Sequence, residues 1–232
     1  MDLNDKNIKL LEVFNTWQGE GVNCGRQMLV TRFKYCDRFC KMCDTWIKMK
    51  TSSEGSYSIN DINESLKKTM GLMVTGGEPT FETDQIHNLT QTIQMINLCH
   101  CQIINVETNG CNIEKLLTAI DIRLVDNRTA KIINVMYSPK IFSEKEYMIE
   151  RERTSKVIHH PDVYLKVVAD GNTWSDKYIR ELSKCEDKGK VYLMPLGTTP
   201  EEIVKNWEYC VNIADECNLN ISSRIHIMHS FS

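Results

Sequence analysis

Short apolar segments alternate with longer amphipathic segments along most of the chain. The apolar segments have the length of β-strands, and several are rich in β-branched residues, which is typical of strands buried in a parallel sheet. The pattern predicts strands at Met28–Phe33, Leu72–Thr75, Ile103–Val106, Ile132–Tyr137, Val163–Val168, Val191–Met194 and Arg224–Met228.

The segments between these strands have features of helices. Apolar residues recur at the spacing of one helix face, and Pro200 is followed by two glutamates, as at a helix start. We predict helices at Asn60–Thr69, which opens with an Asn/Asp cap, and at Asp84–Leu98, Thr173–Cys185 and Pro200–Cys217. Strands that alternate with helices predict an α/β fold with a mostly parallel sheet, whose functional residues gather at the carboxyl ends of its strands.

Three further segments have weaker patterns. Lys48–Ser58 contains Gly and several Ser, which predicts a flexible insert. The charged run Glu144–Lys156 predicts a solvated helix, and Asp121–Lys131 gives no clear prediction. No long linker or internal repeat interrupts the 232 residues, so we expect one domain spanning residues 1–232.

Three cysteines, Cys36, Cys40 and Cys43, lie on one short loop after the first predicted strand. Three thiolates can hold three irons of a 4Fe-4S cube and leave the fourth iron open for chemistry, whereas a cluster for electron transfer normally takes four cysteines. The same spacing also suits part of a zinc site with a further ligand, or three unrelated buried thiols.

Composition narrows the location and the partners. The chain is 41% hydrophobic and 25% charged with a net charge of -3, so neither a nucleic-acid surface nor an acidic membrane is expected as a partner. No apolar run approaches the roughly 20 residues of a membrane span, and the polar amino terminus lacks the apolar core of a signal peptide. We therefore expect a cytoplasmic protein, in which disulfides are disfavoured. Seven other cysteines are predicted to be core or surface thiols: Cys24, Cys99, Cys101, Cys111, Cys185, Cys210 and Cys217.

Two glycine-containing motifs follow predicted strands. The first, Gly76-Gly77-Glu78-Pro79, allows a ligand to approach the backbone closely and offers a carboxylate that could receive an ammonium group. The second is Glu107-Thr108-Asn109-Gly110. Each motif alone is also typical of an ordinary turn.

Together, the cysteine loop and these two motifs resemble the radical S-adenosylmethionine (radical SAM) superfamily. The resemblance narrows with four further features: Phe14–Gly21, Arg32, Tyr137–Lys140 and Leu193–Gly197. With them the chain is similar, from about Leu11 onward, to the family of 7-carboxy-7-deazaguanine synthases.

The resemblance implies a partial, modified (β/α)6 barrel and a lyase of queuosine and 7-deazapurine biosynthesis. It implies ring contraction of 6-carboxy-5,6,7,8-tetrahydropterin to 7-carboxy-7-deazaguanine, with loss of ammonia. The implied cofactors are a 4Fe-4S cluster, SAM and Mg2+. The implied partners are the small pterin substrate, an electron donor such as flavodoxin, and a second copy of the chain in a homodimer.

The resemblance also implies a role for individual residues. The cluster ligands would be Cys36, Cys40 and Cys43, and Thr45 would supply an oxygen to Mg2+. SAM would contact Met42, Cys43, Asp44, Gly76, Gly77, Glu78, Ser138, Pro139, Lys140, Met194, Pro195, Leu196 and Gly197. The substrate would contact Trp17, Gln18, Gly19, Arg32, Thr75 and His229, and the Arg32 guanidinium suits a carboxylate.

The chain departs from the family pattern in places. Tyr35 stands before the first cluster cysteine where members often carry Gly, and the tail ending at Ser232 lacks the Trp-Gly and Arg-Gly of some members. Asn127–Ala130 is predicted to be an added loop.

Two other functions fit part of the pattern. A radical SAM activase that places a glycyl radical on a partner, such as anaerobic ribonucleotide reductase, also carries three cysteines and a Gly-Gly-Glu element. A zinc- or cluster-binding module without enzymatic activity would require a fourth ligand and a basic surface.

Overall fold

A computed structural model of the chain describes residues 7–40, 43, 45–125 and 131–229. The chain divides into two compact units, which are described separately below. The first unit comprises Met1–Thr16 and Arg26–Asn134, and the second comprises Trp17–Gly25 and Val135–Ser232.

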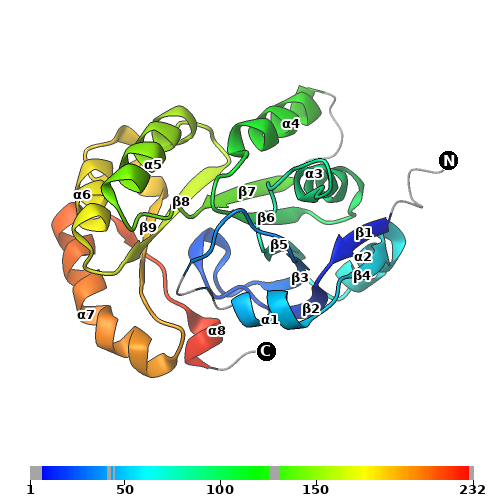
Figure 1. The fold of residues 1–232 in the computed structure, drawn as a ribbon, viewed down its shortest axis with the longest axis horizontal. Coiled ribbons are helices and arrows are strands. Elements are labelled where there is room, and N and C mark those ends of the chain that lie inside the picture. The colour runs from blue at the N-terminus through cyan, green and yellow to red at the C-terminus, as the bar shows by residue number, and fades with distance from the viewer. Residues whose placement is uncertain (1–6, 41–42, 44, 126–130, 230–232) are drawn as a thin grey trace. The chain divides into compact units, whose positions relative to one another are not determined.

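The first unit is built on a β-sheet (Figure 1). Its strands run in the order β6 (Ile103–Thr108), β5 (Gly71–Gly76), β3 (Gln27–Phe33) and β2 (Glu12–Trp17). The pairings of β3 with β5 and of β5 with β6 are parallel, with Thr31 opposite Val74 and Val74 opposite Val106. A separate antiparallel pair joins β1 (Asn7–Leu10) to β4 (Gly55–Ser58).

Among its described residues, this unit has four helices: α1 (Trp46–Thr51), α2 (Ile59–Leu66), α3 (Asn88–Leu98) and α4 (Ile113–Val125). Each of α2 and α3 buries one apolar face, with Ile62 and Leu66 on α2 and Met95 and Ile96 on α3. Burial of such a face is the main source of stability for a short helix.

The second unit repeats this arrangement (Figure 1). Its strand order is β10 (Asn220–Ile221), β9 (Val191–Pro195), β8 (Val163–Ala169) and β7 (Ile132–Tyr137), whose residues from Val135 onward belong to this unit. The pairings of β10 with β9, of β9 with β8 and of β8 with β7 are parallel. The helices are α5 (Glu144–Val157), α6 (Thr173–Leu182), α7 (Pro200–Cys217) and α8 (Ile225–Met228), with short 3-10 turns at Gly21–Asn23 and Glu186–Lys190. Helix α6 packs against β8, and α7 packs against β9.

The predicted α/β class with mostly parallel strands is confirmed, as are six of the seven predicted strands. The seventh prediction, a strand at Arg224–Met228, is wrong because this segment forms the short helix α8. Pairing at the β9 edge ends after two residues of β10, and the Ser222 amide then donates to the Leu193 carbonyl at 2.7 Å. The chain beyond that point turns away from the strand, so its apolar pattern has no sheet to join.

Each predicted helix is present, but α2 and α3 begin at other residues than predicted. Helix α2 is capped by Ser58 in a capping box with Asp61, and not by Asn60 as predicted. Helix α3 begins at Asn88, later than the predicted Asp84, because the Thr83 hydroxyl accepts from the Ile86 amide in a local turn.

The three segments with weaker patterns are largely regular. Lys48–Ser58, predicted to be a flexible insert, contains the end of α1 and the whole of β4. The charged run is the helix α5, as predicted, but it is not fully solvated because Tyr147 and Glu150 are buried. The predicted loop Asn127–Ala130 and the terminal Ser232 lie outside the described residues. No helix in the described ranges has the length and apolarity needed to cross a membrane.

Candidate functional site

The predicted motifs lie at the carboxyl ends of parallel strands, as expected. In the first unit, the Gly-Gly-Glu-Pro motif follows β5 and the Glu-Thr-Asn-Gly motif closes β6. In the second unit, Tyr137–Lys140 follows β7 and Leu193–Gly197 follows β9. Each unit thus presents two of the motifs at the strand ends where α/β proteins place their ligands.

Glu78 joins the two motifs of the first unit. Its carboxylate is buried and accepts hydrogen bonds from the Thr80 amide at 2.8 Å and from the Asn109 amide at 2.6 Å. The hydroxyl groups of Thr80 and Thr108 donate to it at 2.6 and 2.5 Å. Burial raises the pKa of Glu78, although these four hydrogen bonds favour the ionised form. The carboxylate therefore connects the ends of β5 and β6 inside the protein, and its predicted role in SAM binding stays a prediction.

The two glycines before Glu78 are fixed by close contact with the backbone. Gly76 has φ of 109°, which a residue with a side chain rarely adopts. A Cβ atom on Gly77 would lie 2.1 Å from the Tyr35 carbonyl oxygen, so no larger residue fits there. The amide of Glu78 also donates to that carbonyl at 2.7 Å. This geometry brings the backbone of the Gly-Gly-Glu-Pro motif directly against the start of the cysteine loop.

The Glu-Thr-Asn-Gly motif contacts the cysteine loop through Asn109. The Asn109 side-chain amide donates to Asp37 Oδ1 at 2.7 Å and lies 3.8 Å from Cys36 Sγ. The Arg38 amide also donates to Cys36 Sγ, at 3.4 Å. Three segments that are distant in the sequence are thus held together by hydrogen bonds around Cys36.

The three loop cysteines suit an iron–sulfur cluster in their chemistry. Cys36, Cys40 and Cys43 are each partly exposed, and none forms a disulfide. The Cys43 amide donates to the Cys40 carbonyl at 3.2 Å, so a turn joins these two cysteines. Burial raises the pKa of the Cys36 thiol to about 12, and iron would have to displace that proton on binding. Across the described ranges, no three His, Cys, Asp or Glu side chains are grouped closely enough to hold a metal ion.

Two of the predicted SAM contacts flank Cys43 in the sequence. Met42 and Asp44, which were predicted to contact SAM, lie outside the described residues. The neighbouring Phe39 is 77% exposed, and its ring meets that of Trp46 edge-on at 5.1 Å between centroids.

Arg32, Thr75 and Thr45, predicted from two different roles, lie close together in the first unit. Arg32 and Thr75 are direct neighbours in the register of β3 and β5. The Arg32 guanidinium donates through NH1 to Thr45 Oγ1 at 3.1 Å and through Nε to Glu12 Oε1 at 2.6 Å. The predicted substrate arginine and the predicted Mg2+ ligand are therefore in direct contact. Glu12 was missed by the sequence analysis, because nothing in its neighbourhood marks it.

Glu20, directly after the predicted substrate residues Gln18 and Gly19, is paired with cationic side chains of the second unit. Arg224 Nε donates to its Oε1 at 2.7 Å, Lys166 Nζ donates to its Oε2 at 2.5 Å, and His226 Nε2 lies 3.7 Å away. Burial alone would raise the pKa of Glu20, but these cations outweigh it and hold the pKa far below its usual range.

The other predicted residues of the second unit differ in accessibility. Trp17 is 45% exposed, whereas Gln18 is buried and its carbonyl accepts from the Gly25 amide at 2.8 Å. A Cβ atom on Gly19 would collide with the ring of His226. His229 lies at the exposed end of α8.

The two predicted SAM-binding segments of this unit are held locally. Lys140 Nζ donates to Ser138 Oγ at 3.0 Å. The Leu196 carbonyl accepts from the Asn206 side chain at 2.7 Å, and the Gly197 carbonyl accepts from Arg224 NH1. Lys166 and Arg224 were also missed, because no local motif surrounds either residue.

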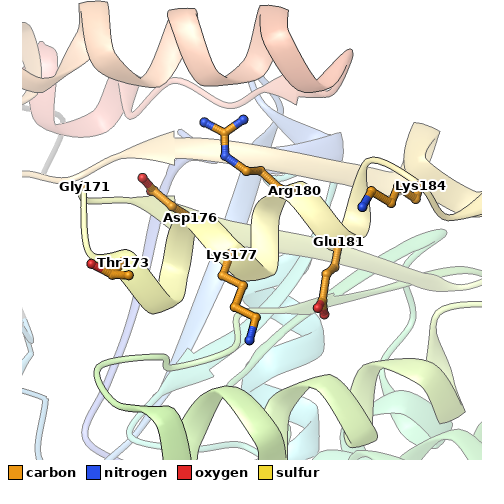
Figure 2. A pocket seen from close by; sticks show the side chains of 7 residues that line it. All are labelled: Gly171, Thr173, Asp176, Lys177, Arg180, Glu181 and Lys184. Atoms are coloured by element: carbon orange, nitrogen blue, oxygen red, sulfur yellow. The ribbon is translucent and has the colours of Figure 1, made fainter.

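A pocket on the surface of α6 lies apart from these motifs (Figure 2). It is lined by Gly171, Thr173, Asp176, Lys177, Arg180, Glu181 and Lys184. Two of its charged side chains have partners within the unit, since Arg180 pairs with Glu216 and Tyr209 donates to Asp176. None of the predicted site residues lines this pocket.

Known proteins share these features. Residues 17–156, which include the three cysteines, match the family described as "4Fe-4S single cluster domain". A 7-carboxy-7-deazaguanine synthase of Hyperthermus butylicus is 23% identical, over 95% of this chain and 92% of its own length. One from Aquifex aeolicus is 24% identical over 96% and 93% of the two chains.

A shorter match and a solved structure agree with these relatives. A 7-carboxy-7-deazaguanine synthase of Haemophilus influenzae is 32% identical over 46% of this chain and 47% of its own. The crystal structure of QueE from Escherichia coli has a similar fold, with a TM-score of 0.58 and 18% identity over 94% and 93% of the chains.

The resemblance predicted from the motifs is confirmed by these relatives, which do not favour a glycyl-radical activase or a zinc module. The family match covers more than half of the sequence and includes all three cysteines of the loop. The chain therefore belongs to the family of 4Fe-4S single-cluster domains.

Proposed function

We propose that the protein is a 7-carboxy-7-deazaguanine synthase of 7-deazapurine biosynthesis. It would contract the ring of 6-carboxy-5,6,7,8-tetrahydropterin and release ammonia. The observation that carries the proposal is the hydrogen-bonded group of cysteine loop, Gly-Gly-Glu-Pro and Glu-Thr-Asn-Gly, in a chain whose relatives of that name match it along nearly its whole length.

The protein's own residues would hold three cofactors. Cys36, Cys40 and Cys43 would ligate a 4Fe-4S cluster with one open iron. The backbone at Gly76 and Gly77 and the segments 138–140 and 194–197 would contact SAM. When bound, the cluster and SAM supply the radical that abstracts the hydrogen at C6 of the pterin. Thr45 would give one oxygen to Mg2+, which commonly keeps water and substrate oxygens as its other ligands.

Arg32 would fix the substrate carboxylate. A guanidinium has more N–H donors than its contacts with Glu12 and Thr45 use, so it can still bind a carboxylate. The partly buried Glu12 contact sets the plane of the fork, which makes the arginine a directional ligand and not only a charge. Trp17, Gln18, Gly19, Thr75 and His229 would supply the remaining substrate contacts.

Several finer features belong to the same proposal. We expect a partial, modified (β/α)6 barrel, a single domain, a homodimer, an electron donor such as flavodoxin and a cytoplasmic location. These expectations rest on the resemblance and on composition.

The decisive experiment is anaerobic reconstitution followed by product analysis. The protein would be incubated with SAM, Mg2+, a strong reductant and 6-carboxy-5,6,7,8-tetrahydropterin, and the products followed by mass spectrometry. We expect 7-carboxy-7-deazaguanine from the wild type and from Cys185→Ala, and none from Cys40→Ala. Formation of 5′-deoxyadenosine with an untouched pterin would overturn the substrate assignment, and absence of both products from iron-loaded protein would overturn the enzyme itself.

A further inference from the structure

Arg224 contacts two loops that come from different parts of the second unit. Its Nε donates to Glu20 Oε1 at 2.7 Å, and its NH1 donates to the carbonyl of Gly197. The side chain is only 12% exposed, so water competes weakly for these hydrogen bonds. One guanidinium thus joins the Gln-Gly-Glu loop (residues 18–20) to the segment 194–197 at the carboxyl end of β9.

The segment that carries Arg224 is itself fastened to the Gln-Gly-Glu loop. The Gly21 amide donates to Ser222 Oγ at 2.8 Å, and the Ile225 amide donates to the Gly19 carbonyl at 3.2 Å. The ring of His226 fills the space beside Gly19. Because backbone and side chains both take part, a shift of this loop requires a shift of the segment that follows β10.

Lys166 provides a comparison, because it is a second cationic partner of Glu20. It reaches Glu20 from β8 and pairs with Oε2, the oxygen opposite the one that Arg224 holds. Loss of Lys166 would weaken the fixation of Glu20 but would leave the contact between Arg224 and Gly197 in place.

We propose that Arg224 is a positioning residue that couples the binding of the pterin to the binding of SAM. This inference rests on the proposed function, which assigns Gln18 and Gly19 to the pterin and residues 194–197 to SAM. A ligand that orders one loop also fixes Arg224, so the second ligand meets a loop that is already ordered. The coupling is reciprocal, because the two affinities share one thermodynamic cycle.

The geometry of arginine is needed for this role. The planar fork directs Nε and NH1 to two acceptors at a fixed angle, whereas the ammonium of a lysine is a single point on a flexible stem. A lysine at position 224 would keep the positive charge near Glu20 and lose the bridge to Gly197. The conservative variant Arg224→Lys therefore separates coupling from charge.

The test measures binding in the reconstituted protein with its cluster kept oxidised, so that no turnover occurs. The dissociation constant of 6-carboxy-5,6,7,8-tetrahydropterin is determined by calorimetry without SAM and with saturating SAM. In the wild type we expect SAM to tighten pterin binding about tenfold, within the usual range of coupling between sites. The coupling ratio is the dissociation constant without SAM divided by that with SAM. In Arg224→Lys and Arg224→Gln this ratio should fall to about one.

Two variants serve as matched controls. Lys166→Gln should weaken pterin binding both with and without SAM while keeping the wild-type ratio. Arg180→Gln, which removes an exposed arginine–glutamate pair of the same unit, should change neither constant. Thermal melts by circular dichroism identify any variant that fails to fold. If Arg224→Gln fails to fold, the ratio measured for Arg224→Lys decides the test.

Each outcome decides the matter. A wild-type ratio retained in Arg224→Lys would overturn the coupling role, as would a ratio of about one in the wild type. A wild type that binds neither SAM nor the pterin would overturn the proposed function together with this inference. Loss of the ratio in the Arg224 variants alone would support it.

Discussion

Two buried glutamates, one in each unit, are stabilised in opposite ways. Glu78 accepts four hydrogen bonds from neutral backbone amides and hydroxyl groups, and burial raises its pKa. Glu20 is surrounded by Lys166, Arg224 and His226, which hold its pKa low in spite of burial. Neutral donors thus satisfy a buried carboxylate without overcoming the cost of its charge, whereas cations overcome it.

The largest effect is expected from removing the carboxylate that neutralises buried cations. Glu20→Ala would leave Lys166 and Arg224 without this partner in the interior, and should lower the free energy of unfolding by about 3–5 kcal/mol. Urea unfolding monitored by circular dichroism measures this loss. Glu216→Gln, which breaks an exposed pair with Arg180, is the control and should unfold like the wild type. A decrease in unfolding free energy of under about 1 kcal/mol for Glu20→Ala would mean that Glu20 and its cationic partners are solvated.

Removing the neutral network should cost less. Glu78→Ala leaves buried donors of Thr80, Thr108 and Asn109 without their acceptor, and should lower the free energy of unfolding by about 2–4 kcal/mol. Glu78→Gln keeps one accepting oxygen, so its free energy of unfolding should fall less than that of Glu78→Ala in the same urea titration. An alanine variant of the exposed Glu64 that loses as much would contradict the role given to Glu78.

The two carboxylates should also respond oppositely to pH. The pKa of Glu20 is lowered, so its contribution to stability is present above its ordinary value of 4.5 and is lost as pH falls through the folded-state pKa. The pKa of Glu78 is raised, so its contribution is present below 4.5 and is lost as pH rises through the folded-state pKa.

Unfolding free energies of Glu20→Gln and Glu78→Gln, compared with the wild type at pH values on both sides of 4.5, test this contrast. The deficit of Glu20→Gln should shrink toward acid pH, and that of Glu78→Gln should shrink toward alkaline pH. Each slope is limited to about 1.4 kcal/mol per pH unit, because one proton is involved. Parallel slopes for the two variants would contradict the comparison.

The smallest effect is expected far from either glutamate. Ser58→Ala removes the side-chain half of the capping box on α2 and should lower the free energy of unfolding by about 1 kcal/mol. Ser65→Ala, on the same helix, removes only a local bond to the Asp61 carbonyl and should have little effect in the urea titration. Equal losses for the two serines would show that the cap is not formed in solution.

Much of the fold could be predicted from the sequence, because burial on both faces makes parallel strands visible as apolar runs. The strand Ile132–Tyr137 and the helix Pro200–Cys217 were predicted with their observed bounds. The errors lie where side-chain hydrogen bonds decide the conformation, as at Ser58 and Thr83, or where an apolar segment finds no neighbouring strand, as after Ile221.

The candidate site was predictable only where residues are consecutive. The cysteine loop and the glycine motifs could be found as short sequence motifs. The contact of Arg32 with Thr45 joins two residues that were both predicted to belong to the site. Glu12, Lys166 and Arg224 could not be found, because their roles arise from contacts with residues distant in the sequence. Only the fold brings such side chains together.

The fastening of the Gln-Gly-Glu loop by Arg224 also bears on how the protein is made. Glu20 precedes its arginine partner by 204 residues, so the loop leaves the ribosome long before that partner is synthesised. Until then its glutamate has no access to Arg224. The loop therefore reaches its final conformation late, after translation of at least residue 224, and nascent chains arrested before that point will contain it unfinished.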